Sequence, residues 1–308
     1  MIKKIKDFVF TYVINLDEKW INPHRFFSRW GTAIILTYAI WLLFAFFQQE
    51  HYLFFPSKHK GQTLAPKGME MELVNFKTED SKKLIGIFFE KEESDEVILY
   101  FHENAGNITN FLGVMALFER LEKNALIFDY RDFGVSEGPL KRENDFILDA
   151  EAAMKYLTQE KGFVPEKTIL WGKELGSFFA AKLAQTHPPK ALILENPMSG
   201  VNDFKPWFLR YGVPSFLIKY KFDLVSELSK LEILPIVLRH TKNEIPEDLK
   251  EVFTNPDQIL EWPKESKALE QTIQNLKQQL QGKILSKMLM DGLDDMEDVL
   301  LQSYYNRF

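Results

Sequence analysis

Short apolar runs alternate with amphipathic stretches through the middle of this 308-residue chain, and that alternation restricts the fold more than any other feature. The runs typical of strands lie at 69–76, 84–89, 96–101, 125–130, 168–171, 191–195, 233–240 and 258–262. Helical patterns separate several of them, at about 108–122, 144–160 and from the turn after 171 to about 186. Strands that are apolar throughout are typical of a parallel sheet covered by helices on both faces. The sequence therefore predicts an α/β fold with a mostly parallel central sheet, in which the first two strands form an antiparallel edge.

The N-terminal part contains an uncharged and largely apolar run from Trp30 to Gln49. Twenty helical residues rise about 30 Å, which matches the hydrocarbon core of a bilayer. The charged leader before the run is long, and no small-x-small cleavage site follows, so a signal anchor is favoured over a cleaved signal peptide. A buried core helix is the alternative. We expect the lipid bilayer to be the partner of residues 30–49.

Basic residues are more frequent before this run than after it. The positive-inside rule therefore predicts a cytoplasmic N-terminus and a folded domain on the extracytoplasmic side of a single-pass membrane protein. Residues 2–14 have apolar side chains at helical spacing among lysines, which is typical of an amphipathic helix on the inner leaflet. The expected organisation is a cytoplasmic leader (1–29), an anchor (30–49), a linker (50–68), an α/β domain (69–265) with a small insertion (197–232), and a C-terminal helical segment (266–308).

Composition limits the chemistry of the chain. The net charge is −6, which does not favour a nucleic-acid partner. The chain has no cysteine, so disulfides, thiolate nucleophiles and cysteine-ligated zinc are excluded. Glu103, Glu174 and His102 could together offer ligands to a hard cation, but the sequence has no closely spaced ligand motif. We expect neither a metal nor a cofactor.

Several motifs point to one known family. Residues 100–107 read YFHENAGN, residues 129–138 read DYRDFGVSEG, and GKELG at 172–176 lies between a strand and a helix. LENP at 194–197 and LPIV at 234–237 follow at later strand ends. This set resembles the α/β-hydrolase superfamily, and within it the membrane-anchored serine hydrolases of the abhydrolase-domain type. The three longer motifs correspond to that family's oxyanion loop, its Asp-Tyr-Arg-Gly-Tyr-Gly-x-Ser-x-Gly signature and its nucleophile elbow, Gly-x-Ser-x-Gly. The resemblance covers about residues 55–262.

The residues that the resemblance assigns to catalysis are changed. Glu174 stands at the nucleophile position, where relatives have serine, or aspartate in some cases. Asn243 falls at the place of the acid, and Glu244 could replace it only by a shift of register. The base histidine should follow the last strand near Lys264, but no histidine occurs after His240. A triad without its base lacks its general acid–base catalyst, so the sequence predicts a degenerate triad.

Other pocket positions are implied by the same resemblance. His102, Glu103 and Asn104 correspond to the oxyanion loop, Leu175 follows the nucleophile, and His240 ends a strand beside the pocket. Glu103 replaces a glycine, so that two carboxylates would oppose a developing oxyanion. His102 or His240 acting as a displaced base is an alternative that the sequence leaves open. Ser136 and Ser177 correspond to structural positions.

The C-terminal segment 266–308 has leucine, isoleucine and methionine at three- and four-residue steps, which predicts an amphipathic helix. Its first part corresponds to a helix that packs on the sheet, and the remainder is expected to contact a protein partner or to fold back on its own domain. We therefore expect a catalytically inactive accessory, scaffolding or binding subunit of a membrane-associated complex. The alternatives are an esterase or thioesterase with unconventional residues and a ligand sensor that keeps the pocket.

Overall fold

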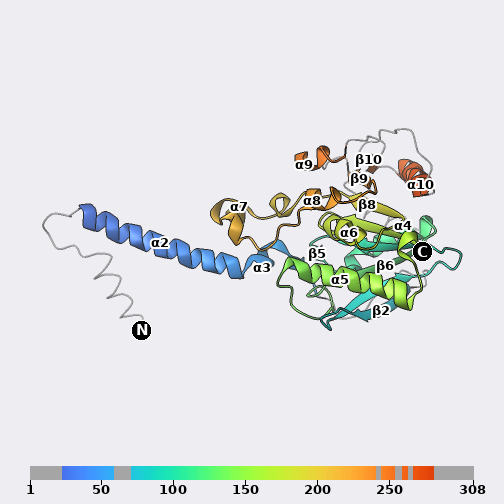
Figure 1. The fold of residues 1–308 in the computed structure, drawn as a ribbon, viewed down its shortest axis with the longest axis horizontal. Helices are drawn as coiled ribbons and strands as arrows, with labels where there is room; N and C mark the ends of the chain where they lie inside the picture. Colours follow the sequence, from blue (N-terminus) through green and yellow to red (C-terminus); the bar gives the residue numbers. More distant parts are fainter. Residues whose placement is uncertain (1–22, 59–70, 241–243, 254–258, 263–265, 281–308) are drawn as a thin grey trace. The chain divides into compact units, whose positions relative to one another are not determined.

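The computed structural model describes residues 23–58, 71–240, 244–253, 259–262 and 266–280. The chain divides into two compact units. One contains the residues up to Gln49 together with Trp207–Ile218, and the other contains Glu50–Pro206 and the residues from Lys219 onward. Each unit is described separately below (Figure 1).

An eight-stranded sheet lies at the centre of the second unit, with the strand order β10-β9-β8-β7-β4-β6-β3-β2. The strands are β2 (Met71–Lys77), β3 (Lys83–Phe89), β4 (Val97–Phe101), β6 (Asn124–Asp129), β7 (Thr168–Lys173), β8 (Ala191–Glu195), β9 (Ile236–His240) and β10 (Ile259–Trp262). Strand β3 pairs antiparallel with β2 and β6, and the other neighbours are parallel. The mostly parallel sheet with an antiparallel edge is confirmed. Two-residue strands β1 (Phe55–Pro56) and β5 (Ala105–Gly106) pair separately.

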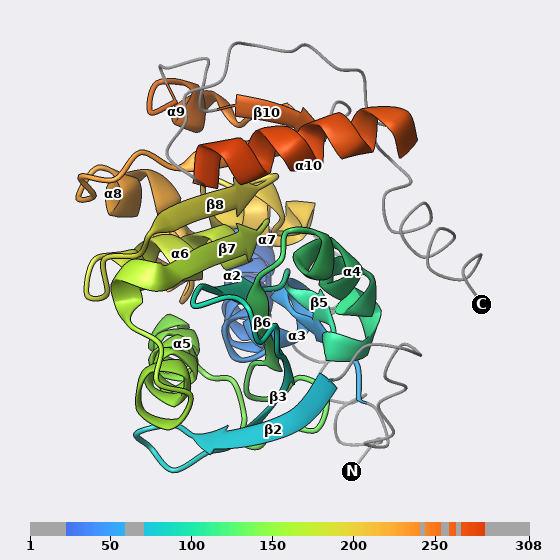
Figure 2. The same ribbon diagram turned by 90° about the vertical axis from the view of Figure 1, so that its right-hand side faces the viewer.

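Helices cover both faces of this sheet (Figure 2). One face carries α4 (Leu112–Arg120) and α10 (Ser266–Leu280), and the other carries α5 (Glu143–Lys155), α6 (Gly176–Ala184) and α8 (Leu224–Leu228). A 3-10 turn (Ile108–Phe111) precedes α4, a π-turn (Tyr156–Glu160) extends α5, and 3-10 turns Pro165–Lys167 and Val201–Asp203 and helix α9 (Glu247–Lys250) lie in connections.

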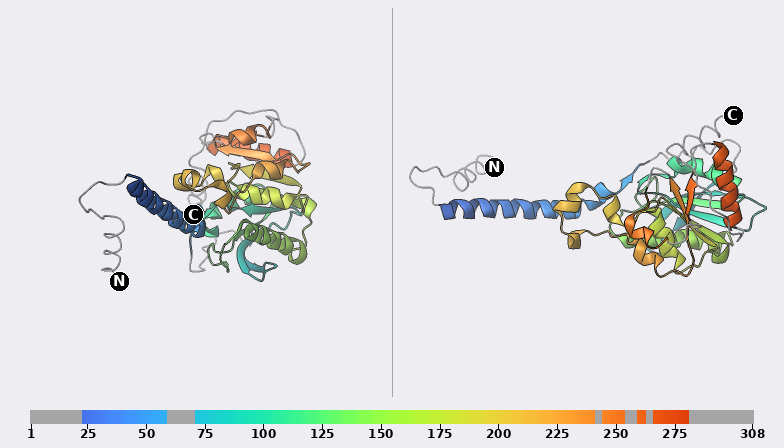
Figure 3. Two further views of the ribbon diagram at one scale, coloured as in Figure 1. Left: turned by 60° about the vertical axis from the view of Figure 1, so that its left-hand side comes forward. Right: turned by 90° about the horizontal axis from the view of Figure 1, so that it is seen from above.

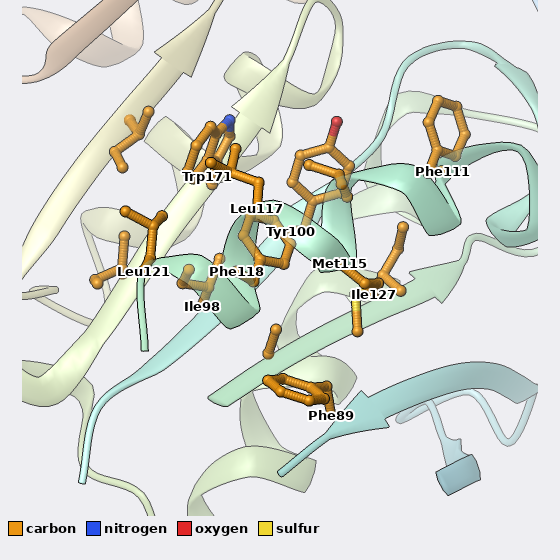
Figure 4. Close-up of a cluster of buried hydrophobic side chains, with 14 of the residues drawn as sticks. Phe89, Ile98, Tyr100, Phe111, Met115, Leu117, Phe118, Leu121, Ile127 and Trp171 are labelled. Atoms are coloured by element: carbon orange, nitrogen blue, oxygen red, sulfur yellow. The ribbon is translucent and has the colours of Figure 1, made fainter. Parts of the chain in front are cut away.

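The core on the α4 face is built from large side chains of several elements (Figure 4). Tyr100 of β4, Trp171 of β7 and Phe118 of α4 are almost completely buried there. Helix α10 adds Ile273, Leu276 and Leu280 to the same cluster. The apolar stripe that the sequence shows at the start of segment 266–308 therefore packs on the sheet.

The first unit contains helix α2 (Pro23–Phe47) and, from inside the insertion, α7 (Trp207–Gly212) and the 3-10 turn Ser215–Leu217. Within α2, the stretch Trp30–Phe47 is long and apolar enough to cross a membrane, and only 6% of that stretch is buried. A short helix α3 (Gln49–Leu53) follows.

Some boundaries differ from those predicted. Strand β9 begins at Ile236 and not at 233, because Pro235 has no N–H to donate to a sheet ladder. Helix α2 begins at Pro23, before the predicted anchor, because proline fits the first turn of a helix. The segment 50–68, expected to be a linker, begins with the end of α3 and with β1, because β1 finds a backbone partner in β5.

Candidate functional site

A sharp turn joins β7 to α6 and presents Glu174 at its tip. Glu174 has a φ of +49°, in the left-handed region that a non-glycine residue rarely occupies. A Cβ atom on Gly172 would lie 2.3 Å from the carbonyl oxygen of Gly176, and one on Gly176 would lie 2.0 Å from that of Phe101. No side chain fits in either place, so both glycines are required for the close packing of α6 on the sheet. This is the geometry of a nucleophile elbow.

Hydrogen bonds to β8 and within the turn itself stabilise the turn between β7 and α6. The N–H of Glu174 donates to the carbonyl oxygen of Glu195 on β8 at 2.7 Å, and Ser177 donates from its N–H to the carbonyl of Glu174 at 3.1 Å. The hydroxyl of Ser177 donates to the carbonyl of Gly172 at 2.9 Å and is buried. Ser177 therefore holds the turn together, in the structural position implied by the sequence.

The carboxyl group of Glu174 lies in an unfavourable electrostatic setting. Burial, and after it the neighbouring carboxylate of Glu103, raise its pKa to about 7, against the opposing effect of Lys173. Lys173 forms an ion pair with Glu103 at 3.3 Å. Among the described residues, none forms a hydrogen bond or salt bridge with the carboxylate of Glu174. The position that holds the nucleophile in the related enzymes thus carries a partly protonated acid.

Another carboxylate, that of Glu195, belongs to the residue whose backbone carbonyl bonds this turn. Glu195 is buried at the end of β8, where it accepts a hydrogen bond from Trp171 Nε1 at 2.9 Å and lies 3.4 Å from His240 Nε2. Burial would raise the pKa of Glu195, but the hydrogen bond to His240 and the charge of Lys173 hold it below its usual value. The backbone N–H of His240 donates to the side chain of Asn196 at 2.9 Å. Parallel strands β8 and β9 therefore bring an imidazole and a carboxylate together beside Glu174.

A pocket of about 320 Å³ opens at this end of the sheet. Its lining residues are Glu174, Asn196, Pro197, Met198, Asp203, Arg239, Glu244, Ile245 and Pro246. Arg239 is paired with Glu261 of β10. The pocket has apolar walls from proline, methionine and isoleucine side chains and three carboxyl groups, which distinguishes it from a simple hydrophobic cavity.

The oxyanion-loop residues are used for structure. His102 is completely buried, stacks on Phe111 at 5.0 Å between ring centres, and donates through Nδ1 to the carbonyl of Glu103 at 2.7 Å. Burial lowers the pKa of His102 to about 3, so its 4.0 Å approach to Asp129 is not an ion pair at neutral pH. Asn104 donates to the carbonyl of Leu53 at 2.7 Å, and Leu175 is buried at the start of α6. Ser136 bridges Asp129 and the backbone of β3, which agrees with its expected structural place.

Sequence reasoning missed three residues of this region: Glu195, Asp203 and Arg239. Glu195 carries a recognisable signal, because a carboxylate directly ends an apolar strand at the edge where parallel strands present functional groups. The positions predicted for the lost acid and base, Asn243 and Lys264, lie outside the described residues. Within the described ranges, no group of three histidine, aspartate or glutamate side chains is arranged to hold a metal ion.

Comparison with known proteins identifies the family. Residues 92–290, well over half of the chain, match the family described as serine aminopeptidase, S33, a hydrolase family. The chain belongs to the α/β-hydrolase superfamily. This hydrolase-fold chain has Glu174 at the elbow position from which serine members of the superfamily take their nucleophile.

Curated relatives and solved structures agree with that assignment. The chain is 30% identical over 203 residues to protein bem46 of Schizosaccharomyces pombe, a match that covers 62% of this chain and 67% of bem46. It is 29% identical to the α/β-hydrolase domain-containing protein WAV2 of Arabidopsis thaliana, with 58% of this chain and 63% of WAV2 covered. An esterase of Pyrococcus furiosus has the same fold, with a TM-score of 0.55 and 17% identity over 76% of this chain and 99% of the esterase. The match thus spans about two thirds or less of the curated relatives' own length.

Proposed function

We propose that this chain is a membrane-anchored α/β-hydrolase-fold protein that acts by binding, as an accessory or scaffolding subunit, and not by serine-type hydrolysis. The observation that carries the proposal is the electrostatics at the elbow, where Glu174 replaces serine and has a pKa near 7 beside Glu103. Acyl transfer needs donors directed at a developing negative charge. The carboxylates of Glu103 and Glu174 would instead favour a positive charge at the elbow.

The histidines of the chain support the same proposal. His102 is buried and held neutral, and the last histidine of the sequence, His240, lies against Glu195 before the final strand. A serine-type mechanism needs a histidine within hydrogen-bond reach of the nucleophile.

Activity assays test the proposal directly. We expect the purified full-length chain to hydrolyse no p-nitrophenyl ester of any chain length and to resist labelling by a fluorophosphonate probe. We also expect Glu174→Ser to restore nothing measurable, because triad members act as a unit. Stoichiometric probe labelling, or turnover that Glu174→Ala abolishes, would refute the proposal.

A second candidate is ester hydrolysis through unconventional residues. It is favoured by one arrangement: the His240–Glu195 pair lies beside Glu174 at the pocket. In that case turnover would be lost in both Glu174→Gln and His240→Gln, and retained in His187→Gln, whose imidazole pairs with Glu151 elsewhere on the domain. A ligand sensor is the non-catalytic variant of this candidate, since the pocket has volume and apolar walls.

The proposal includes a membrane topology with residues 1–29 cytoplasmic and the hydrolase-fold domain extracytoplasmic. Reporter fusions at Lys60 and at Phe308 distinguish the two orientations. We expect alkaline phosphatase to be active and green fluorescent protein dark at both positions. Fluorescence at both positions would invert the topology while keeping a single span.

We further propose a protein partner for the part of the C-terminal segment beyond α10. Residues 281–308 lie outside the described residues, and in sequence they combine methionine and leucine with five acidic residues between 291 and 298. Methionine-rich surfaces suit adaptable protein contacts. A chain ending at Lys283 should keep its melting temperature and lose a co-purifying partner. A melting temperature that falls by many degrees, with the same partners retained, would assign the tail to the chain's own core.

A further inference from the structure

Segment 207–218 of the insertion packs against helix α2, although about 170 residues separate them in the sequence. Tyr38 of α2 donates its hydroxyl hydrogen to the carbonyl of Gly212 at 2.9 Å, and Gln49 donates from Nε2 to the carbonyl of Leu217 at 2.8 Å. A Cβ atom on Gly212 would lie 2.6 Å from the ring of Trp41, so the glycine leaves room for that ring between α2 and α7. These residues form one compact unit, and Figure 3 shows α7 beside the C-terminal part of α2.

Some apolar side chains of segment 207–218 are buried and others are exposed on the surface. Leu209, Val213 and Ile218 are buried. Facing outward are Trp207, Tyr211 and Phe216, which are 75%, 80% and 84% exposed. Arg210 is the single charged residue in the sequence of this segment. A surface in water does not gather large aromatic side chains in this way without a partner.

The position of the contacts along α2 indicates what that partner is. Tyr38 lies near the middle of the apolar stretch Trp30–Phe47, about 12 to 14 Å of helix rise from either end. A segment bonded to Tyr38 therefore reaches the depth of the membrane when α2 spans it. Gly212 is the last residue of α7, and the final carbonyls of a helix have no partner within it, so at that depth other protein groups must bond them. Tyr38 and Gln49 do this for the two carbonyls that they bond.

We propose that segment 207–218 enters the bilayer beside α2, with Trp207, Tyr211 and Phe216 in contact with lipid. The insertion is thus a second membrane contact of the same chain, formed by a re-entrant hairpin-like segment. The inference rests on the proposed role of α2 as a membrane span.

The absence of cysteine allows a direct test, because a single introduced cysteine can be labelled specifically. We would prepare the full-length chain with Tyr211→Cys, Phe216→Cys, Ile35→Cys or Leu73→Cys, attach an environment-sensitive nitrobenzoxadiazole dye, and reconstitute each protein in phosphatidylcholine vesicles. Ile35 in α2 reports on the anchor, and Leu73, 52% exposed on β2 of the sheet unit, is the matched water-exposed control.

We expect the dye at 211 and 216 to be several-fold brighter and blue-shifted relative to the dye at 73, and to be quenched by lipids that carry a nitroxide. If the dye at position 35 is bright but the dyes at positions 211 and 216 have the same emission as the dye at position 73, this inference is overturned and the anchor is retained. Such a result would mean that the aromatic face meets water or another protein. If the dye at position 35 also has the same emission as the dye at position 73, both the anchor and this inference are overturned.

Discussion

Lys173 forms its ion pair with Glu103, at 3.3 Å, although the acidic Glu174 is the next residue in the chain. The pair joins the loop after β4 to the elbow after β7, across two strands that are neighbours in the sheet. Both side chains are about one-fifth to one-quarter exposed, so the interaction is partly shielded from water. It holds Glu103 in place beside Glu174, where the charge of Glu103 raises the pKa of Glu174 and the charge of Lys173 lowers it.

Removing the lysine should therefore cost stability. We expect Lys173→Met to lower the free energy of unfolding at pH 8 by about 1 kcal/mol, because Glu103 and Glu174 would then repel each other without a nearby cation. Lys167→Met is the control, because its partner Asp95 is 72% exposed, and it should change stability by less than Lys173→Met does. Chemical denaturation of both variants measures the difference, and equal losses would contradict the prediction.

The raised pKa of Glu174 predicts a pH-dependent effect of neutralising it. The folded chain holds this proton up to about pH 7, whereas the ordinary pKa is 4.5, so the associated stability is complete below pH 4.5 and is lost as the pH rises through 7. Glu174→Gln should therefore be more stable than the parent at pH 8, by about 1 to 2 kcal/mol after allowance for partial exposure, and equal to it near pH 4. Unfolding curves across this range test the sign; a difference that is independent of pH would argue against it.

The elbow glycines should be irreplaceable for steric reasons. Gly176→Ala places a methyl group against the backbone of Phe101 and should destabilise the fold by more than about 3 kcal/mol. Gly162→Ala is the matched control, because its φ of +79° is strained for alanine but its Cβ position is open. We expect it to cost about 1 kcal/mol. Thermal unfolding of the two variants should rank them in this order, and the reverse order would show that the close approach is relaxed in solution.

The signature motif contributes a buried ion pair whose loss should be costly. Arg131 is buried and bonds Asp149 from its backbone N–H at 2.8 Å and from Nε at 2.9 Å. Asp149→Ala removes the most deeply buried of the carboxylates paired with the guanidinium and should cost about 3 to 5 kcal/mol. Asp80→Ala removes a partner that is 38% exposed and should cost about 1 kcal/mol. Similar losses in both variants would contradict this account.

Local sequence predicted the features that depend on neighbours in the chain. The four-residue spacing of Gly172 and Gly176 indicates an elbow, and the apolar runs indicate strands, because both follow from steric and periodic rules that act within a few residues. Helix α10 followed from the spacing of Ile273, Leu276 and Leu280.

Features that depend on register across the sheet were not predictable in the same way. Glu195 meets His240 because β8 and β9 align Glu195 with Leu238, two residues before the histidine. The sequence around Glu195 and the sequence around His240 do not predict that register. The contact of Gly212 with Tyr38 is of the same kind, since it joins a connection late in the chain to its first helix.

The place of α10 in the core also sets an order of events during synthesis. Leu276 belongs to the same buried cluster as Ile98, so the core on that face is complete only after residue 280 has left the ribosome. Helix α2 is finished far earlier, and its apolar stretch is available to a membrane while most of the sheet is still unmade. The nascent chain consequently has to carry a sheet with one face only partly covered, by α4, until its last described helix is made.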